Sequence, residues 1–109
     1  MAMVDEDRHQ ALRASAASVR SSPGIRRLHL WGKALSDHTR LVILSLLKTH
    51  VELTATEIHH ALNISHAAVS QHMKLLQDAG MVHVRRRGKW AYYRIDDSVK
   101  GLLPETSPP

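Results

Sequence analysis

The sequence has no cysteine among its 109 residues. This absence excludes disulfide bonds, thiolate metal ligands and cysteine nucleophiles, and it fits a reducing cytoplasm, where we expect the protein to lie. No apolar run approaches the roughly 18 residues that a membrane span needs. The first ten residues carry acids where a secretory signal would be basic and then apolar. We therefore expect no membrane association.

The chain also lacks the motifs of common enzyme classes. It has no glycine-rich phosphate-binding loop and no nucleophile elbow. Ser70 and His72 are two residues apart on an expected helix, so they cannot share the hydrogen bond that a catalytic triad requires. We expect the protein not to be an enzyme.

The positive charge is concentrated in one part of the chain. The net charge is +5, and residues 58–95 hold six lysines and arginines against one acid. The remainder holds nine residues of each sign, so its charges cancel. A surface that only promoted solubility would spread the charge more evenly. The localised excess instead predicts a polyanionic partner, which we expect to be double-stranded DNA.

The stretch from Ser65 to Gly80 predicts a helix that reads DNA. Ser65 is suited to the N-cap, and Gly80 can adopt the left-handed conformation that ends a helix. Val69, His72, Met73 and Leu76 form an apolar stripe at helical spacing. The other face of this helix carries short or polar side chains, as a helix in the major groove requires. The residues that we expect to contact DNA there are Ser65, His66, Ala67, Ser70, Gln71 and Lys74.

The next stretch predicts a β-hairpin with a basic tip. Val82 and Val84 alternate with polar residues, residues 86–89 form the expected turn on Gly88, and residues 90–95 alternate again. A capped helix followed by such a hairpin is the winged helix-turn-helix arrangement. A solvated charge run is the simpler alternative, but clustering at one tip favours phosphate contacts. The predicted phosphate-binding residues are Arg85, Arg86, Arg87 and Lys89.

These patterns predict a mainly α-helical protein with a small β-hairpin, divided into three parts. Residues 1–24 should be a dimerisation helix, since the apolar side formed by Val4, Leu12, Ala16 and Val19 is too thin to fold alone. Residues 25–103 should form the winged helix-turn-helix domain. Residues 104–109 should be a disordered tail.

Local signals place the helices of the middle part. Residues 25–35 should form a helix with Ile25, Leu28, Trp31 and Leu35 facing inward. A buried central helix should follow Asp37. Further helix starts are marked by a capping box formed by Thr54 and Glu57 and by an N-cap at Asp96.

Residues 28–97 resemble the ArsR/SmtB family of small bacterial metal-responsive repressors. The resemblance rests on LSDHTRLVILSLL at residues 35–47, on S-x-H-M-K-x-L-x-x-A-G-M-V from Ser70, and on R-x-G-K-x-x-Y-Y from Arg86, in register. It implies a homodimer bound to a palindromic operator, and usually release of DNA when an inducer binds.

The departures from the family pattern concern its metal sites. Thr54 and Thr56 stand where the family's C-x-C site would be, and threonine does not bind a soft metal. A second familiar site uses an Asp-x-His pair on the last helix and another pair about three turns later. Asp97 is present, but Val99 replaces the histidine, and the sequence ends before the second pair. Neither site can form in its usual way.

Nine histidines suggest a borderline metal such as nickel, cobalt or zinc, held by imidazole and carboxylate groups. Asp5 and His9 have ligand spacing at i, i+4, and Glu57 and His60 have it at i, i+3. Other histidines have simpler expected roles: His72 in the core, His66 toward DNA, His83 away from the core, and His59 and His60 pointing in different directions. A regulator with a non-metal signal and a histidine-rich metal carrier are the alternatives, although a carrier would cluster its histidines.

Overall fold

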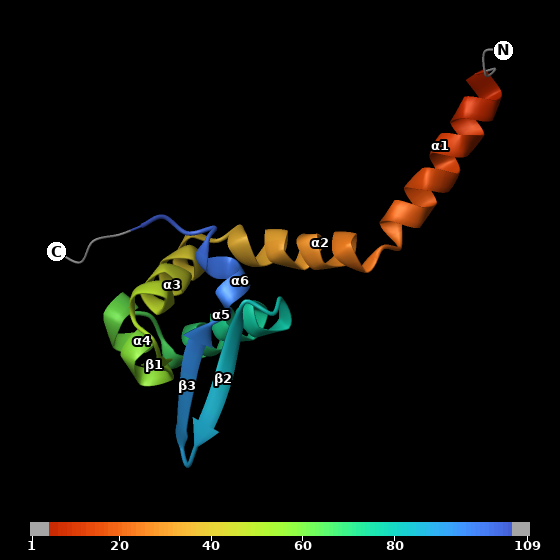
Figure 1. The fold of residues 1–109 in the computed structure, drawn as a ribbon. Coiled ribbons are helices and arrows are strands. Elements are labelled where there is room, and N and C mark those ends of the chain that lie inside the picture. The colour runs from red at the N-terminus through yellow and green to blue at the C-terminus, as the bar shows by residue number, and fades with distance from the viewer. Residues whose placement is uncertain (1–4, 106–109) are drawn as a thin grey trace.

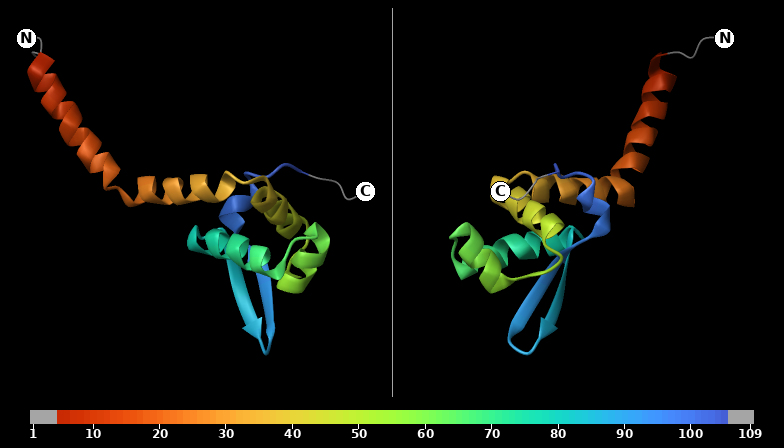
Figure 2. Two further views of the ribbon diagram at one scale, coloured as in Figure 1. Left: turned by 180° about the vertical axis from the view of Figure 1, so that it is seen from behind. Right: turned by 60° about the vertical axis from the view of Figure 1, so that its left-hand side comes forward.

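The computed structural model describes residues 5–105. The chain measures 66 Å along its longest axis because the first helix projects from a body formed by the other elements (Figures 1 and 2). The elements follow in the order α1 (Asp5–Arg20), α2 (Pro23–Leu35), α3 (His38–Thr49), β1 (Leu53–Thr54), α4 (Ala55–Leu62), α5 (His66–Asp78), β2 (Val82–Arg87), β3 (Trp90–Ile95) and α6 (Asp97–Lys100).

The helix starts that the sequence predicts are present with their caps. Ser65 Oγ accepts a hydrogen bond from the Ala68 N–H at 3.0 Å, and Asp37 accepts one from the Arg40 N–H at 3.0 Å. Thr54 and Glu57 form the reciprocal capping box. These contacts satisfy backbone donors that have no partner within their own helices, and so they fix where α3, α4 and α5 begin.

The sheet consists of the predicted hairpin and one short strand that the sequence does not predict. Its order is β1-β3-β2, and all pairs are antiparallel. Arg87 pairs with Trp90, so the loop contains only Gly88 and Lys89, and Gly88 has a φ of +61°. The expected turn at residues 86–89 is thus too long: Arg86 and Arg87 belong to β2, because the two-residue loop lets the strands pair up to its edge.

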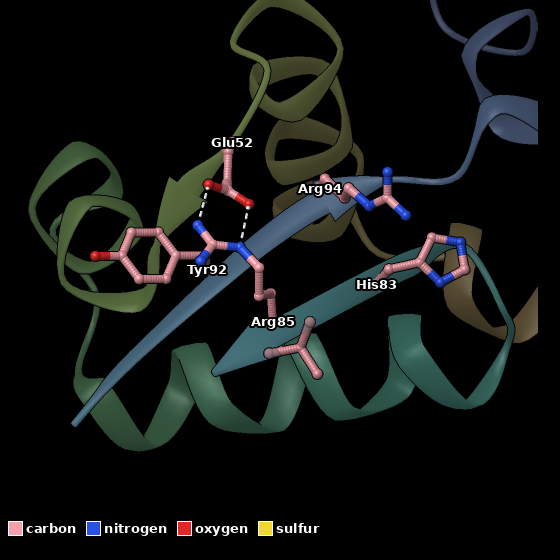
Figure 3. Close-up of a pocket in the computed structure, with 6 residues that line it drawn as sticks. Glu52, His83, Arg85, Tyr92 and Arg94 are labelled. Carbon is pink, nitrogen blue, oxygen red and sulfur yellow. Dashed lines mark hydrogen bonds and ion pairs between the residues drawn. The ribbon is translucent and has the colours of Figure 1, made fainter. Parts of the chain in front are cut away.

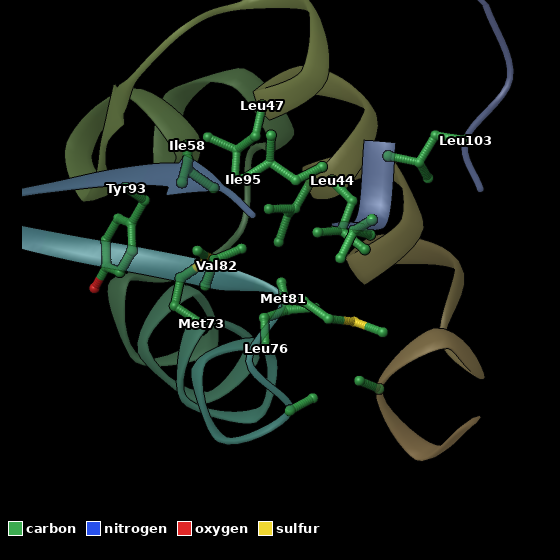
Figure 4. Packing of buried hydrophobic residues seen from close by; sticks show 14 of the residues in the cluster. Leu44, Leu47, Ile58, Met73, Leu76, Met81, Val82, Tyr93, Ile95 and Leu103 are labelled. Atoms are coloured by element: carbon green, nitrogen blue, oxygen red, sulfur yellow. The ribbon is translucent and has the colours of Figure 1, made fainter. Parts of the chain in front are cut away.

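The core lies where α3, α5 and the inner face of the sheet meet (Figure 4). The central helix α3 contributes Ile43, Leu44 and Leu47, while its other apolar residues are only half-buried. The remaining buried apolar residues are Ala34, Ile58, Val69, Met73, Leu76, Ala79, Met81, Val82, Tyr93, Ile95, Val99 and Leu103.

The N-terminal half of α2 corrects one prediction. Ile25 and Leu28 do not face inward; their exposed fractions are 43% and 63%. Only Trp31, Ala34 and Leu35 pack against the core, because the body of the protein covers just the C-terminal half of this helix. The helical spacing predicts which residues share one face of α2. It does not predict how far along the helix the rest of the protein covers that face.

The ends of the described chain differ in their contacts. No residue of α1 is buried. Val4, expected on its apolar side, lies outside the described residues. At the other end, Lys48 Nζ contacts the Leu103 carbonyl oxygen at 3.0 Å and Glu105 Oε1 at 2.9 Å. Residues 106–109 of the expected tail also lie outside the described part. Within residues 5–105, no helix has the length and apolar character needed to cross a membrane.

Candidate nucleic-acid interface

Helix α5 has one buried face and one exposed, polar face. Val69, Met73 and Leu76 are fully buried, as the apolar stripe predicts. The fourth member, His72, has the hydrogen-bond partner that was expected, Arg40, but it is half-buried and not part of the core. The exposed side carries every residue predicted to contact DNA from this helix and its cap: Ser65, His66, Ala67, Ser70, Gln71 and Lys74.

The C-terminal end of α5 is held by a residue that is distant in the sequence. The indole Nε1–H of Trp31 donates a hydrogen bond to the Ala79 carbonyl oxygen at 2.8 Å. Gly80 follows with a φ of +72°, as expected of the residue that ends the helix. The hydrogen bond from Trp31 at this end and the cap at Ser65 at the other end fix the position of α5, and with it the positions of its exposed side chains.

Three histidine rings gather where α4 turns into α5. The rings of His59 and His66 are stacked, with centroids 3.9 Å apart. His59 also meets His60 edge to face at 4.8 Å, and its Nδ1 lies beside the Ile64 carbonyl oxygen. The rings of His59 and His60 thus meet only at their edges, and His59 is half-buried while His60 is exposed. The stacking of His59 on His66 was not expected, and it arises because the turn at Asn63 brings His66 back against α4. His66 remains exposed on the side of α5 that carries the other candidate residues.

The hairpin of β2 and β3 is the wing, and its tip carries three exposed cationic side chains. Arg86 and Arg87 lie at the end of β2, and Lys89 is in the loop, with its Nζ 5.4 Å from the centre of the Trp90 ring. Within residues 5–105, neither Arg86 nor Arg87 forms an ion pair with a carboxylate. These two guanidinium groups are thus available to an external anion.

Arg85, the fourth predicted phosphate contact, has a different environment (Figure 3). Its guanidinium binds both oxygens of Glu52, at 2.9 and 3.4 Å, and lies 4.5 Å from the centre of the Tyr92 ring. The hydrogen bond that Arg85 donates to Glu52 raises the pKa of Arg85 above its usual value. Sequence reasoning missed this pair, because Glu52 lies 33 positions earlier. Arg85 holds the wing against the segment before β1 rather than standing free.

A hydrogen bond between His83 and Asp96 joins the base of the wing to the start of α6. His83 Nε2 lies 2.6 Å from Asp96 Oδ1, so the side chain points away from the core, as predicted. Asp96 also caps α6 by accepting from the Ser98 N–H at 3.1 Å. The Ser98 hydroxyl donates to the same carboxylate, and together with the His83 contact it lowers the pKa of Asp96 to about 2.

The metal sites implied by the family resemblance do not fit these residues. Thr54 Oγ1 is occupied as a helix cap, and Val99 is apolar and fully buried. Glu57 Oε1 accepts from the Thr54 N–H, so that carboxylate already has a structural role. Asp5 and His9 are exposed on α1. In the described part of the chain, no three histidine or carboxylate side chains are grouped so that they could hold a metal ion.

Comparisons with known proteins agree with this geometry. A family model described as a helix-turn-helix domain matches residues 35–85. The arsenical resistance operon repressor of Bacillus subtilis is 32% identical over 74 residues, which cover 67% of this chain and 70% of the repressor. The arsenic resistance transcriptional regulator ArsR1 of Pseudomonas putida is 39% identical over 67 residues, covering 62% of this chain. Those residues are 52% of ArsR1, so this chain spans about half of that relative's length.

A solved structure matches most of the folded body. It is the solution NMR structure of a homodimeric winged helix-turn-helix DNA-binding domain from Mycobacterium bovis, described as a possible ArsR-family transcriptional regulator. The TM-score is 0.67, the sequences are 33% identical, and the match covers 72% of each chain.

Proposed function

The chain belongs to the ArsR/SmtB family of winged helix-turn-helix transcriptional regulators, and from this premise we propose that it is a sequence-specific DNA-binding regulator. The observation that carries the proposal is the polar, exposed side of α5 together with the cations at the tip of the β2–β3 hairpin, of which Arg86 and Arg87 have no carboxylate partner among residues 5–105. The hairpin projects from the body of the protein (Figure 1). The helix would lie in the major groove, where Gln71 can form two hydrogen bonds with one adenine. Arg86, Arg87 and Lys89 would bind phosphates and thereby fix the register.

We further propose that the protein acts as a homodimer on a palindromic operator. The support is apolar surface that the body does not cover: Leu12 and Val19 on α1, and Ile25, Leu28 and Leu30 on α2. Two copies joined through these helices would present two copies of α5. Recognition helices of such dimers reach major grooves about 34–36 Å apart, so the half-sites should be one helical turn apart.

An in vitro selection tests this function. The purified protein is used to select duplexes from a random-sequence pool, and binding of the selected duplex is followed by fluorescence anisotropy. We expect enrichment of an inverted repeat with half-site centres about 10–10.5 base pairs apart. If no sequence is enriched although all duplexes bind, the protein is a non-specific DNA-binding protein, and the proposed regulator is wrong.

For the signal, we propose a divalent metal of borderline softness, namely nickel, cobalt or zinc. Without cysteine, the ligands must be imidazole and carboxylate groups, which suit these ions better than arsenite, lead or copper(I). Asp5 and His9 are four residues apart on the exposed helix α1, so one copy can offer both to the same ion. Two side chains do not complete a coordination sphere, and the second copy would have to supply the rest.

Calorimetry with nickel and zinc separates the possible signals. We expect binding to the full-length protein, weaker binding to His9→Ala, and weaker binding at acidic pH, since protons compete for imidazole. Unchanged binding to His9→Ala would keep the metal but discard this site. Absence of binding to either ion would leave a DNA-binding regulator with a non-metal signal.

A further inference from the structure

The guanidinium of Arg40 joins three helices. Arg40 lies in the first turn of α3, and its side chain is only 11% exposed. Its Nε donates to the Ala34 carbonyl oxygen at 2.8 Å, and one terminal nitrogen donates to the Lys33 carbonyl oxygen at 3.2 Å. These two carbonyls lie in the last turn of α2. The other terminal nitrogen lies 3.2 Å from Nδ1 of His72 on α5.

For Arg40 to donate to His72, the Nδ1 atom of that ring needs a lone pair. A guanidinium has five N–H donors and no acceptor, and it does not lose its proton in proteins. The Nδ1 atom of His72 must therefore accept, which requires a lone pair on that nitrogen. The imidazole is then neutral and carries its proton on Nε2. A protonated ring would have no acceptor to offer and would place a second positive charge against Arg40.

The side chain of Asp37 also lies near this contact. Asp37, the N-cap of α3, has Oδ2 3.9 Å from the Arg40 guanidinium. The Arg40 backbone N–H, which donates to Asp37, lowers the pKa of this carboxyl below its usual value, so Asp37 remains a carboxylate that balances the guanidinium. Helix α2 contributes only its backbone carbonyls to Arg40.

We propose that Arg40 is a positioning residue that sets the angle between α2 and the recognition helix α5 through neutral His72. The proposal rests on the proposed function, in which α2 adjoins the second copy and α5 reads DNA. Arg40 binds the end of α2 and the middle of α5 in one rigid, planar group. A change in that contact would alter the spacing of the two recognition helices. Contacts with phosphates are less demanding, so non-specific binding should persist.

The proposal predicts an effect of acidification with a defined sign. A protonated His72 offers no acceptor to Arg40, so specific affinity should be lower at acidic pH than at neutral pH. Other histidines, His66 in particular, can strengthen phosphate binding when they become protonated. The informative quantity is therefore the difference between the wild type and a His72 variant, in which the contributions of the other histidines cancel.

The test uses two substitutions at His72 in the full-length protein. His72→Asn places an amide oxygen near the position of Nδ1 and cannot be protonated. His72→Leu has a similar size and offers no acceptor. Affinity is measured by anisotropy for the duplex selected with the wild-type protein and for a scrambled duplex. At pH 7.5 we expect His72→Asn to remain within about threefold of the wild type and His72→Leu to lose tenfold or more in specific affinity, with scrambled-duplex affinity within about twofold.

Two further measurements keep the proposal testable if His72→Leu does not fold. Specific affinity of the wild type should fall relative to that of His72→Asn as the pH is lowered from 7.5 to 5.5. Long-range ¹⁵N correlation spectra of the wild-type protein without DNA should identify the Nε2–H tautomer of His72 at pH 7.5.

The outcomes distinguish this inference from the proposed function. Equal specific affinity of the wild type and His72→Leu, a parallel pH profile for His72→Asn, or a proton on Nδ1 would each overturn the role of Arg40. Failure of the wild type to select any sequence would overturn the proposed function itself. In that case the tautomer measurement, which needs no DNA, can still overturn the Arg40–His72 contact, because a proton on Nδ1 would leave Arg40 no acceptor there.

Discussion

Glu52 and Arg85 form a bidentate ion pair that joins the segment before β1 to the middle of the wing. The pair divides the basic residues of the hairpin into two groups. Arg85 is neutralised within the protein, while Arg86 and Arg87 at the tip have no carboxylate partner in the part of the chain that the structure describes. The wing therefore combines a structural cation at its middle with cations at its tip that are free to bind an external anion.

The first prediction concerns the salt dependence of DNA binding. Replacing both Arg86 and Arg87 by Ala should weaken binding to every duplex and reduce the slope of log affinity against log salt by about two, since each phosphate contact contributes about one. Anisotropy titrations at several salt concentrations measure this slope. Arg85→Ala is the matched control and should leave it nearly unchanged. An equal loss of slope for Arg85→Ala would show that all the arginines of the wing bind phosphates alike.

The second prediction concerns base recognition by α5. Gln71→Ala should relax the preference at particular positions of the operator, at a cost of roughly 1–3 kcal/mol for each base that Gln71 reads. The salt slope should not change. Gln77→Ala is the control, because the Gln77 amide donates to the Met73 carbonyl oxygen on the same helix. Competition with single-base variants of the selected duplex measures the effect. A uniform loss across all these variants would contradict the assigned role.

The features that were predictable from the sequence are those set by neighbouring residues. The caps at Asp37, Thr54 and Ser65 and the turn at Gly88 depend on local backbone chemistry, which the sequence displays directly. Contacts between distant segments were not predictable in this way.

The pairs that determine how the site works all span long stretches of chain. Trp31 meets Ala79, Arg40 meets His72, and Glu52 meets Arg85. Their identities follow from the packing of helices and strands, and no spacing rule in a single sequence contains that information. The exposure of Ile25 and Leu28 could not be predicted for the same reason. Helical spacing defines a face of the helix, but it does not show how much of that face other elements cover.

The third prediction concerns stability at acidic pH. The pKa of Asp96 is about 2 in the folded protein, below its usual value of 3.8, chiefly because the Ser98 hydroxyl donates to it and His83 does so next. A lowered pKa stabilises the folded state above pH 4, and this contribution is lost as the pH falls toward 2. Asp96→Asn should thus have a lower melting temperature than the wild type at pH 5, with the difference shrinking toward pH 2. Thermal unfolding followed by circular dichroism measures this, and a difference independent of pH would contradict the role of the charge.

The fourth prediction concerns assembly. Because no residue of α1 is buried, removal of residues 1–20 should leave the core intact. The truncated protein should nevertheless be monomeric and bind the operator poorly, since the exposed side chains of Leu12 and Val19 would no longer be available to the second copy. Multi-angle light scattering gives the mass. An intact dimer would move the interface to α2, where Leu28→Glu should then produce monomers.

The central claim is that the exposed side of α5 and the tip of the wing form the DNA-binding surface. The most direct measurement is a titration of ¹⁵N-labelled protein with the selected duplex, followed by backbone amide chemical shifts. We predict the largest changes at His66, Ser70, Gln71 and Lys74 on α5 and at Arg86, Arg87 and Lys89 on the wing, with little change on α1. Changes confined to α1 and the N-terminal half of α2, with α5 and the wing unaffected, would contradict the account.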